Sequence, residues 1–142
     1  MKTQGIKQVI AFDFGLKQIG VATGSVLSGI ATELCILKAK DGAPDWHEIT
    51  QILEEWHPDI CLVGLPLNMD DTESAISTRA RKFANQLHGR TGIKIEFVDE
   101  RLTSFEAKAM SKEQGHKGDY KDAPIDALAA RLLAEQWLRQ NS

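Results

Sequence analysis

Asp13 is a carboxylate inside an otherwise apolar segment of the chain. Residues 9–12 and Phe14 are all apolar, and Gly15 follows as a turn signal. An ionised carboxylate that is removed from water is costly unless it is paired, hydrogen-bonded or bound to a metal ion. One interpretation is a structural aspartate whose oxygens accept from backbone N–H groups at the turn. We favour a metal ligand, because two further carboxylates occupy comparable positions.

The second carboxylate lies at the end of a later apolar segment. Residues 93–98 have the composition of a strand, and Asp99 and Glu100 follow directly. In sheets of alternating strands and helices, ligands bind beyond the carboxyl ends of the strands. Successive residues of a strand point to opposite faces of the sheet. The sequence therefore leaves open whether Asp99 or Glu100 lies with Asp13.

The third carboxylate, Asp126, lies in the last expected helix. At helical spacing it shares one stripe with apolar residues further along the helix, namely Ala129, Ala130, Leu133 and Trp137. A carboxylate on this core-facing stripe is not placed for solvent. The alternative interpretation is a first-turn aspartate, just after Pro124, that is stabilised by the helix dipole.

Three partly buried carboxylates repel one another unless a cation lies among them. Oxygen ligands with positions left for water suit Mg²⁺ or Mn²⁺, and no cluster of histidine and cysteine suggests zinc. Two such ions can activate water and stabilise the leaving oxygen during hydrolysis of a phosphodiester. Asp13, Asp126 and the pair Asp99 and Glu100 therefore suggest a metal-dependent site.

The elements that must position these residues alternate in type along the chain. Apolar patterning predicts strands over 8–14, 19–23, 30–37, 60–64 and 93–98. Four helices are expected. The first begins at the capping pair Asp45 and Glu48, and the second carries an apolar stripe from Ile76 and ends near His88-Gly89. A short third helix begins at Thr103, and the last runs from Pro124 to about residue 139. The segment 111–122 is expected to be a loop. This order predicts an α/β fold with a mixed five-stranded sheet and helices on both faces.

Composition is that of an ordinary single domain, and we assign residues 1–142 to one unit. The formal net charge of −3 argues mildly against a protein that depends on one large phosphate-binding surface. Cys35 and Cys61 each lie in an apolar run, which predicts reduced core thiols in a cytoplasmic protein. We expect neither a signal peptide nor a membrane span.

Four segments of the chain resemble one family in the correct order. They are residues 12–22, 63–70, 99–103 and 126–130, with the sequences FDFGLKQIGVA, VGLPLNMD, DERLT and DALAA. Together they closely resemble the motifs of the YqgF family, also called RuvX, over nearly the whole chain. One departure is Asp71, where family members often have glycine after the aspartate of the second motif.

The resemblance implies a ribonuclease H-like fold and a nuclease that processes the 5′ end of pre-16S rRNA in the bacterial cytoplasm. It carries catalytic, metal-binding roles onto Asp13, Glu100 and Asp126. It also implies RNA as a partner, with branched DNA, the ribosome and the transcription machinery as further possible partners. Candidate residues for holding nucleic acid are Lys17, Asn68, Arg79, Arg81 and Arg101.

Other functions stay open at this point. Asp13, Gly15 and Gly20 also resemble a phosphate loop of the actin and sugar-kinase superfamily, but those proteins use two such domains, and this chain has the length of one. A non-catalytic module that binds RNA or a transcription complex is another alternative. Within the nuclease class, resolving a Holliday junction needs two symmetric cuts and hence a dimer. Processing of rRNA does not, and we expect a monomer.

Overall fold

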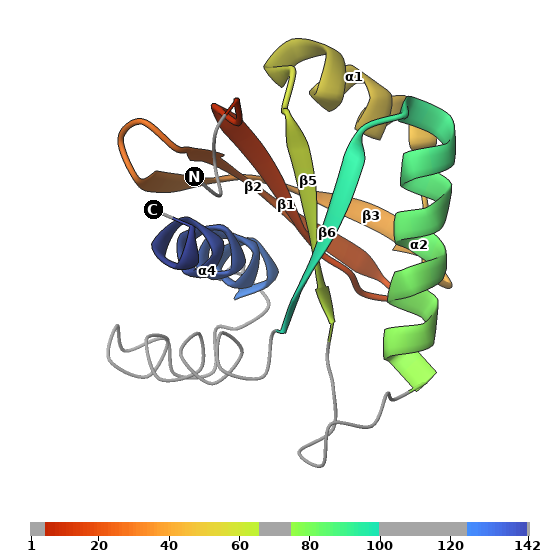
Figure 1. The fold of residues 1–142 in the computed structure, drawn as a ribbon. Coiled ribbons are helices and arrows are strands. Elements are labelled where there is room, and N and C mark those ends of the chain that lie inside the picture. The colour runs from red at the N-terminus through yellow and green to blue at the C-terminus, as the bar shows by residue number, and fades with distance from the viewer. Residues whose placement is uncertain (1–4, 66–74, 100–124, 142) are drawn as a thin grey trace.

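The computed structural model describes residues 5–65, 75–99 and 125–141, without the side chains of residues 125 and 126. The strands are β1 (Gln8–Asp13), β2 (Gln18–Ser25), β3 (Ile30–Lys40), β4 (Ala43–Pro44), β5 (Ile60–Leu65) and β6 (Lys94–Asp99). The helices are α1 (Trp46–Trp56), α2 (Ala75–Thr91) and α4 (Ile125–Gln140). Figure 1 shows them around one twisted sheet.

The sheet has the strand order β4-β3-β2-β1-β5-β6. Neighbouring strands from β1 to β4 pair antiparallel, whereas β1, β5 and β6 pair parallel. The prediction of a mixed sheet is therefore confirmed. The predicted number of strands was one too low, because β4 contributes only two residues, which pair with Ala39 and Lys40 of β3. Two residues are too few to produce a pattern in the sequence.

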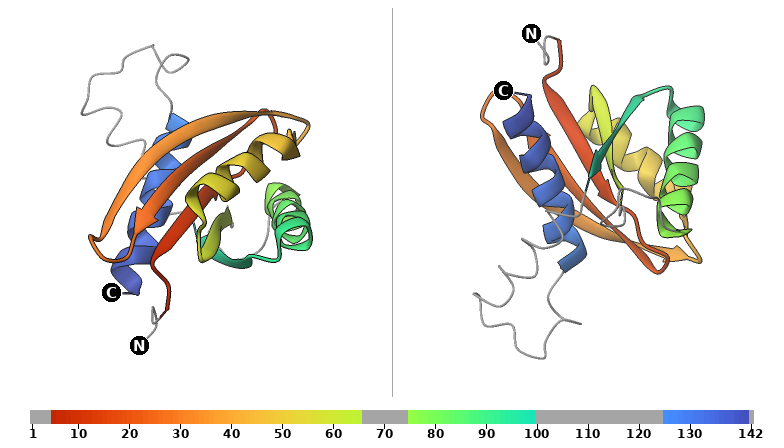
Figure 2. Two further views of the ribbon diagram at one scale, coloured as in Figure 1. Left: turned by 90° about the horizontal axis from the view of Figure 1, so that it is seen from above. Right: turned by 60° about the horizontal axis from the view of Figure 1, so that its bottom comes forward.

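Helices cover both faces of the sheet, as predicted. Helices α1 and α2 lie on one face and α4 lies on the other (Figure 2). The side chains of β1 divide between two hydrophobic clusters in the same way. Ile10 and Phe12 pack with residues of α1 and α2, whereas Val9 and Ala11 pack with residues of α4. A strand places alternate side chains on opposite faces, so the two clusters follow directly from the sequence of β1.

Both ends of α1 are capped as the sequence indicates. The Asp45 carboxylate accepts from the backbone N–H of His47 at 2.9 Å, which satisfies one free donor of the first turn. His57 ends the helix in the left-handed region, with φ of 48°, and its N–H donates to the carbonyl oxygen of Leu53.

The predicted end of the second helix was wrong. The helix continues through His88 and Gly89 to Thr91, and Gly92, with φ of 74°, is the residue that leaves it. A glycine at positive φ ends a helix at little steric cost, whereas a glycine such as Gly89 is tolerated inside one.

Two further expected elements lie in a part of the chain that the structure does not describe. The short helix from Thr103 and the loop over 111–122 lie outside the described residues. Among the helices that are described, none combines the length and the apolar character needed to cross a membrane.

Candidate active site

Asp13 is the last residue of β1 and is partly exposed to solvent. It follows Val9 and Ala11 on the face of the sheet that α4 covers, while Phe12 and Phe14 belong to the cluster under α1 and α2. The predicted orientation of Asp13 is thereby confirmed. Because β1 lies between β2 and β5, this carboxylate is at the middle of the sheet and at the carboxyl end of its parallel part.

Glycines flank Asp13 on both neighbouring strands. Gly20 of β2 is its direct partner in the antiparallel ladder. On the other side, Val63 of β5 pairs with Phe12, so the next residue, Gly64, lies level with Asp13. Neither glycine is among those with positive φ, so the backbone conformation does not require glycine at either position. Their common feature is the absence of a side chain beside the Asp13 carboxylate.

The alternation along β6 distinguishes Asp99 from the residue that follows it. Val98 belongs to the cluster under α4, whereas Ile95 and Phe97 pack against the cluster on the opposite face. Asp99 therefore lies on the face opposite to Asp13, and its backbone carbonyl accepts from the side-chain amide of Gln136 at 3.5 Å. Glu100 itself lies outside the described residues.

Helix α4 is attached to the sheet by polar contacts on two sides. The indole N–H of Trp137 donates to the Glu96 carboxylate of β6 at 2.9 Å. Arg131 forms an ion pair with Glu33 of β3, with 3.2 Å between the guanidinium nitrogen and the carboxylate oxygen. These contacts, one toward each side of the sheet, fix the direction of α4 across it.

Residue 126 belongs to the first turn of α4, and its side chain lies outside the described residues. Leu133 and Trp137, which share its stripe at helical spacing, are buried in the cluster between α4 and the sheet. Of the predicted core-facing stripe, Ala130, Leu133 and Trp137 are buried, whereas Ala129 is partly exposed. Within 5–65, 75–99 and 125–141, no group of three histidine, cysteine, aspartate or glutamate residues is arranged to hold a metal ion. Glu100 lies outside that part of the chain, and the side chain of Asp126 is not described either.

The candidate residues for nucleic-acid binding differ in their surroundings. Lys17 is exposed in the turn between β1 and β2, close in sequence to Asp13. The Arg79 guanidinium donates to the backbone carbonyl of Asp41 and forms an ion pair with its carboxylate at 3.5 Å. Arg81 lies over the ring of Phe97, 4.9 Å from its centre. Asn68 and Arg101 lie outside the described residues.

Neither cysteine is suited to act as a nucleophile. Burial raises the pKa of Cys61 to about 12, and the pKa of Cys35 is raised by burial and then by the nearby Glu48 carboxylate. A thiol with a raised pKa stays protonated at neutral pH and is a poor nucleophile. Cys61 is buried in the core, as predicted, and Cys35 is partly exposed.

Sequence reasoning did not place Gly20 and Gly64 beside Asp13. Each lies inside a strand, where glycine is unfavourable and can mark a close approach of another group. Only the pairing register shows that the neighbour is Asp13 in both cases.

Comparison with known proteins assigns this chain to a family. The model of the RuvX family, described as Holliday junction resolvase, matches residues 7–140. A protein of Azotobacter vinelandii named "Putative pre-16S rRNA nuclease" is 52% identical over 136 residues, which are 96% of each chain. A protein of Chromohalobacter salexigens with the same name is 49% identical over 142 residues, covering 100% of this chain and 96% of that protein.

Solved structures of junction resolvases share the fold. Thermus thermophilus RuvC in complex with a Holliday junction superposes with a TM-score of 0.55 and 18% identity, covering 94% of this chain and 96% of that one. The fowlpox virus resolvase with its junction DNA gives a TM-score of 0.55 and 13% identity over 94% and 97% of the two chains. The ribonuclease H-like fold predicted from the sequence is thereby confirmed. The chain belongs to the RuvX family, whose named relatives are nucleases, the enzymes that hydrolyse phosphodiester bonds.

Proposed function

We propose that this protein is a metal-dependent endonuclease that processes the 5′ end of pre-16S rRNA, with Asp13, Glu100 and Asp126 as its catalytic residues. The observation that carries the proposal is the position of Asp13 at the carboxyl end of the central strand, on the α4 face, with a glycine on each side. The relatives from Azotobacter and Chromohalobacter, which carry the name of a pre-16S rRNA nuclease, supply the substrate class.

The choice of Glu100 over Asp99 follows from the alternation of β6. Val98 faces the same side of the sheet as Asp13, and the residue two positions further along an extended strand returns to that side. Asp126 is proposed for a similar reason. It shares a helical stripe with Leu133 and Trp137, which pack against the Asp13 face.

The residues fit a divalent metal ion in two respects. Three carboxylates provide only oxygen ligands, which Mg²⁺ and Mn²⁺ prefer. The glycines beside Asp13 bring no side chain that would occupy the space next to its carboxylate. A pair of such ions, when bound, supplies activation of water and stabilisation of charge on the phosphate.

The chain's own contribution is to hold its carboxylates in fixed positions. Asp13 is fixed because its strand pairs on both sides, with β2 and with β5. Helix α4, which carries Asp126, is held on the sheet by the contacts of Trp137 with Glu96 and of Arg131 with Glu33. Lys17, exposed beside the same strand end, is proposed to contact the RNA backbone, as are Asn68 and Arg101. We propose the same for Arg81 and Arg79.

A four-way DNA junction is the second candidate substrate. The family description and the resolvase structures that contain junction DNA favour it. Resolution of a junction requires two symmetric cuts and a dimer. We propose instead a monomer that acts in the cytoplasm and meets its RNA on the ribosome or the transcription machinery.

The decisive experiment compares cleavage of pre-16S leader RNA, unrelated single-stranded RNA and a four-way DNA junction, each with Mn²⁺, with Mg²⁺ and with a chelator. We expect metal-dependent cleavage of the leader RNA. Asp13→Asn should reduce the rate by about a thousandfold or more, because misplacing the metal removes both nucleophile activation and charge stabilisation. Glu100→Gln and Asp126→Asn should behave similarly, while Asp99→Asn serves as the matched control.

Three results would contradict the proposal. They are cleavage that does not depend on Asp13, a larger loss for Asp99→Asn than for Glu100→Gln, and symmetric cutting of the junction in preference to RNA. Turnover of ATP without nucleic acid would instead support the kinase-like alternative. Binding of RNA without any cleavage that depends on the three carboxylates would support a non-catalytic module.

A further inference from the structure

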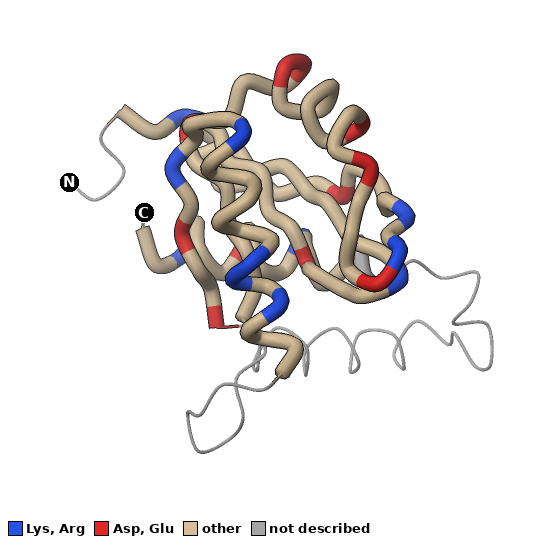
Figure 3. The backbone as a smooth tube through the Cα atoms, turned by 90° about the vertical axis from the view of Figure 1, so that its right-hand side faces the viewer, with Lys and Arg blue, Asp and Glu red and all other residues tan. Residues whose placement is uncertain are grey.

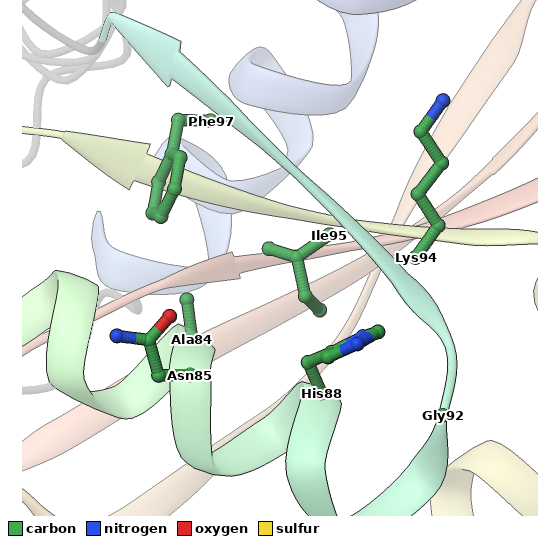
Figure 4. Close-up of a pocket in the computed structure, with 7 residues that line it drawn as sticks. All are labelled: Ala84, Asn85, His88, Gly92, Lys94, Ile95 and Phe97. Atoms are coloured by element: carbon green, nitrogen blue, oxygen red, sulfur yellow. The ribbon is translucent and has the colours of Figure 1, made fainter.

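A groove runs between α2 and the edge strand β6, away from Asp13. Its volume is about 330 Å³, and Figure 4 shows the residues that line it. Ala84 of α2 and Ile95 and Phe97 of β6 provide apolar surface, while Asn85 and His88 of α2 provide polar groups. The side chain of Lys94 points away from the groove (Figure 4). The groove is therefore a mainly apolar slot with polar groups along one wall.

The helix that forms this wall is strongly basic. Residues 75–91 contain Arg79, Arg81, Lys82 and Arg90 and no acidic residue, although the whole chain has a formal net charge of −3. Figure 3 shows the contrast with the acidic residues of α1. Arg81 precedes Asn85 by one helical turn and lies over the Phe97 ring at the end of the groove. This charge distribution attracts a polyanion to the outer side of α2.

Two polar groups in the groove are available to a ligand. The amide of Asn85, on an exposed residue, makes no hydrogen bond to another described residue. It can donate and accept side by side, as needed to bind the edge of an adenine. His88 Nδ1 lies 2.9 Å from the carbonyl oxygen of Ile93, which can only accept, so Nδ1 carries the proton. In the neutral ring, Nε2 is then left as an acceptor.

An apolar slot with an aromatic ring, an arginine and a free amide has the chemistry that proteins use to hold an unpaired base. Single-stranded RNA is recognised by stacking on aromatic rings or guanidinium planes and by hydrogen bonds to exposed base edges. We propose that the groove between α2 and β6 binds one unpaired base, with adenine preferred, of the RNA that the active site cleaves. The proposal rests on the proposed function for the identity of this polymer.

The register of the sheet places the groove within reach of the active site. Phe97 pairs with Val63, and Val63 pairs with Phe12, the residue before Asp13. Two strand spacings, about 10 Å, therefore separate β1 from β6 along the sheet, and the groove lies on the face opposite to Asp13. Since β6 is at the edge of the sheet, an RNA strand can pass around it from one face to the other.

Binding can be measured without cleavage, using Asp13→Asn protein in a chelator and fluorescently labelled oligonucleotides of equal length. The set comprises single-stranded oligoadenylate, single-stranded oligouridylate and an abasic ribose-phosphate chain. We expect oligoadenylate to bind about tenfold more tightly than the abasic chain. Adding Asn85→Ala or Phe97→Leu should remove that difference, while the affinity for the abasic chain stays constant.

Gln86→Ala is the matched control, because it removes a similar exposed amide from the next position of the same helix, outside this groove. It should preserve the preference for oligoadenylate. Because Asn85 is exposed, the Asn85→Ala protein should fold. The test can therefore be made with this variant even if Phe97→Leu is unstable.

Three outcomes would overturn the proposal. One is equal affinity for oligoadenylate and the abasic chain, and another is an equal loss in Gln86→Ala and Asn85→Ala. The third is that an acidic peptide displaces the RNA, that this displacement requires Asn85, and that the protein binds RNA equally well with and without bases. This outcome would assign the groove to a protein partner. The nuclease proposal is tested separately, because it fails if the wild-type protein with metal does not cleave RNA.

Discussion

The two faces of the sheet are built from side chains of different size. On the face that α1 and α2 cover, β1 and β2 present Phe12, Ile19 and Val21. On the face that α4 covers, paired positions of the same strands carry Ala11 opposite Ala22 and Asp13 opposite Gly20. Large side chains fill the core under α1 and α2, whereas small ones at these positions allow α4 to lie close to the strands. One face mainly stabilises the protein, and the other forms the candidate site.

The largest difference between the faces should appear in the stability of two variants. Phe83 of α2 contacts the rings of Phe12, Phe14 and Trp46, with ring centres 5.4–5.6 Å apart. Phe83→Ala should lower the free energy of unfolding by about 3–5 kcal/mol, because it removes buried area and leaves a cavity. Asp13→Asn should leave this free energy unchanged or higher in the absence of metal, since it removes one charge from the three carboxylates of the proposed site.

Urea denaturation of the two variants and the wild type measures both values. A loss of stability in Asp13→Asn as large as that in Phe83→Ala would favour the structural interpretation of Asp13. As a further check, Mn²⁺ should raise the melting temperature of the wild type and of Asp99→Asn, but not that of Asp13→Asn.

A smaller change is expected when alanine replaces Gly24 or Gly20, two glycines on the same face of β2, and the two substitutions should differ in what they impair. A Cβ atom on Gly24 would lie 2.9 Å from Cγ2 of Val9 and 3.3 Å from Cδ1 of Leu138 in α4. Gly24→Ala should therefore lower the free energy of unfolding by about 1–3 kcal/mol through overpacking. Gly20→Ala places its methyl group beside Asp13 instead, and should reduce cleavage about a hundredfold by shifting the site.

The comparison needs both measurements on both variants, namely urea denaturation and the rate of RNA cleavage under saturating metal. Gly20→Ala should change the free energy of unfolding by less than about 1 kcal/mol, the usual scale of a glycine-to-alanine exchange in a strand. Full activity of Gly20→Ala would show that the absence of a side chain at residue 20 has no bearing on the site.

An effect that is absent at neutral pH concerns Cys61 on the face of α1 and α2. Burial raises the pKa of this thiol from 9.0 to about 12. The unfolded chain therefore loses the thiol proton at a lower pH than the folded protein, and the free energy of unfolding should decrease as the pH rises from 9 toward 12. Cys61→Ala should flatten this part of the pH profile. Iodoacetamide at pH 8 should leave Cys61 unmodified in the folded wild type and label it after denaturation.

Much of this fold was predictable because its elements have clear local signals. The alternation around Asp13 predicted which face it occupies, and the capping pair at Asp45 predicted the start of α1. The strand β4 was not predictable, because a two-residue pairing depends on the turn at Asp41 and Gly42 rather than on a pattern of its own. The end of α2 was misplaced because Gly89 and Gly92 give similar signals, and tertiary packing selects between them.

The candidate site was predictable in part. A carboxylate in an apolar strand is a local signal, and it identified Asp13. The neighbours of Asp13 are a property of the register between distant segments. Gly20 and Gly64 became visible only through that register, as did the groove beside Phe97. The assignments of Glu100 and Asp126 stay predictions until cleavage by the variants is measured.

Strand β1 is the place where the sheet changes from antiparallel to parallel pairing, and it has a neighbour on each side along Val9–Phe12. Backbone amides in such a doubly paired central strand exchange with solvent deuterium only when the whole domain opens. The carboxylate of Asp13 is thus attached to the segment that local fluctuations disturb least. Gradual warming should fray the outer strands first, so that the amides of β6 take up deuterium at a lower temperature than those of β1.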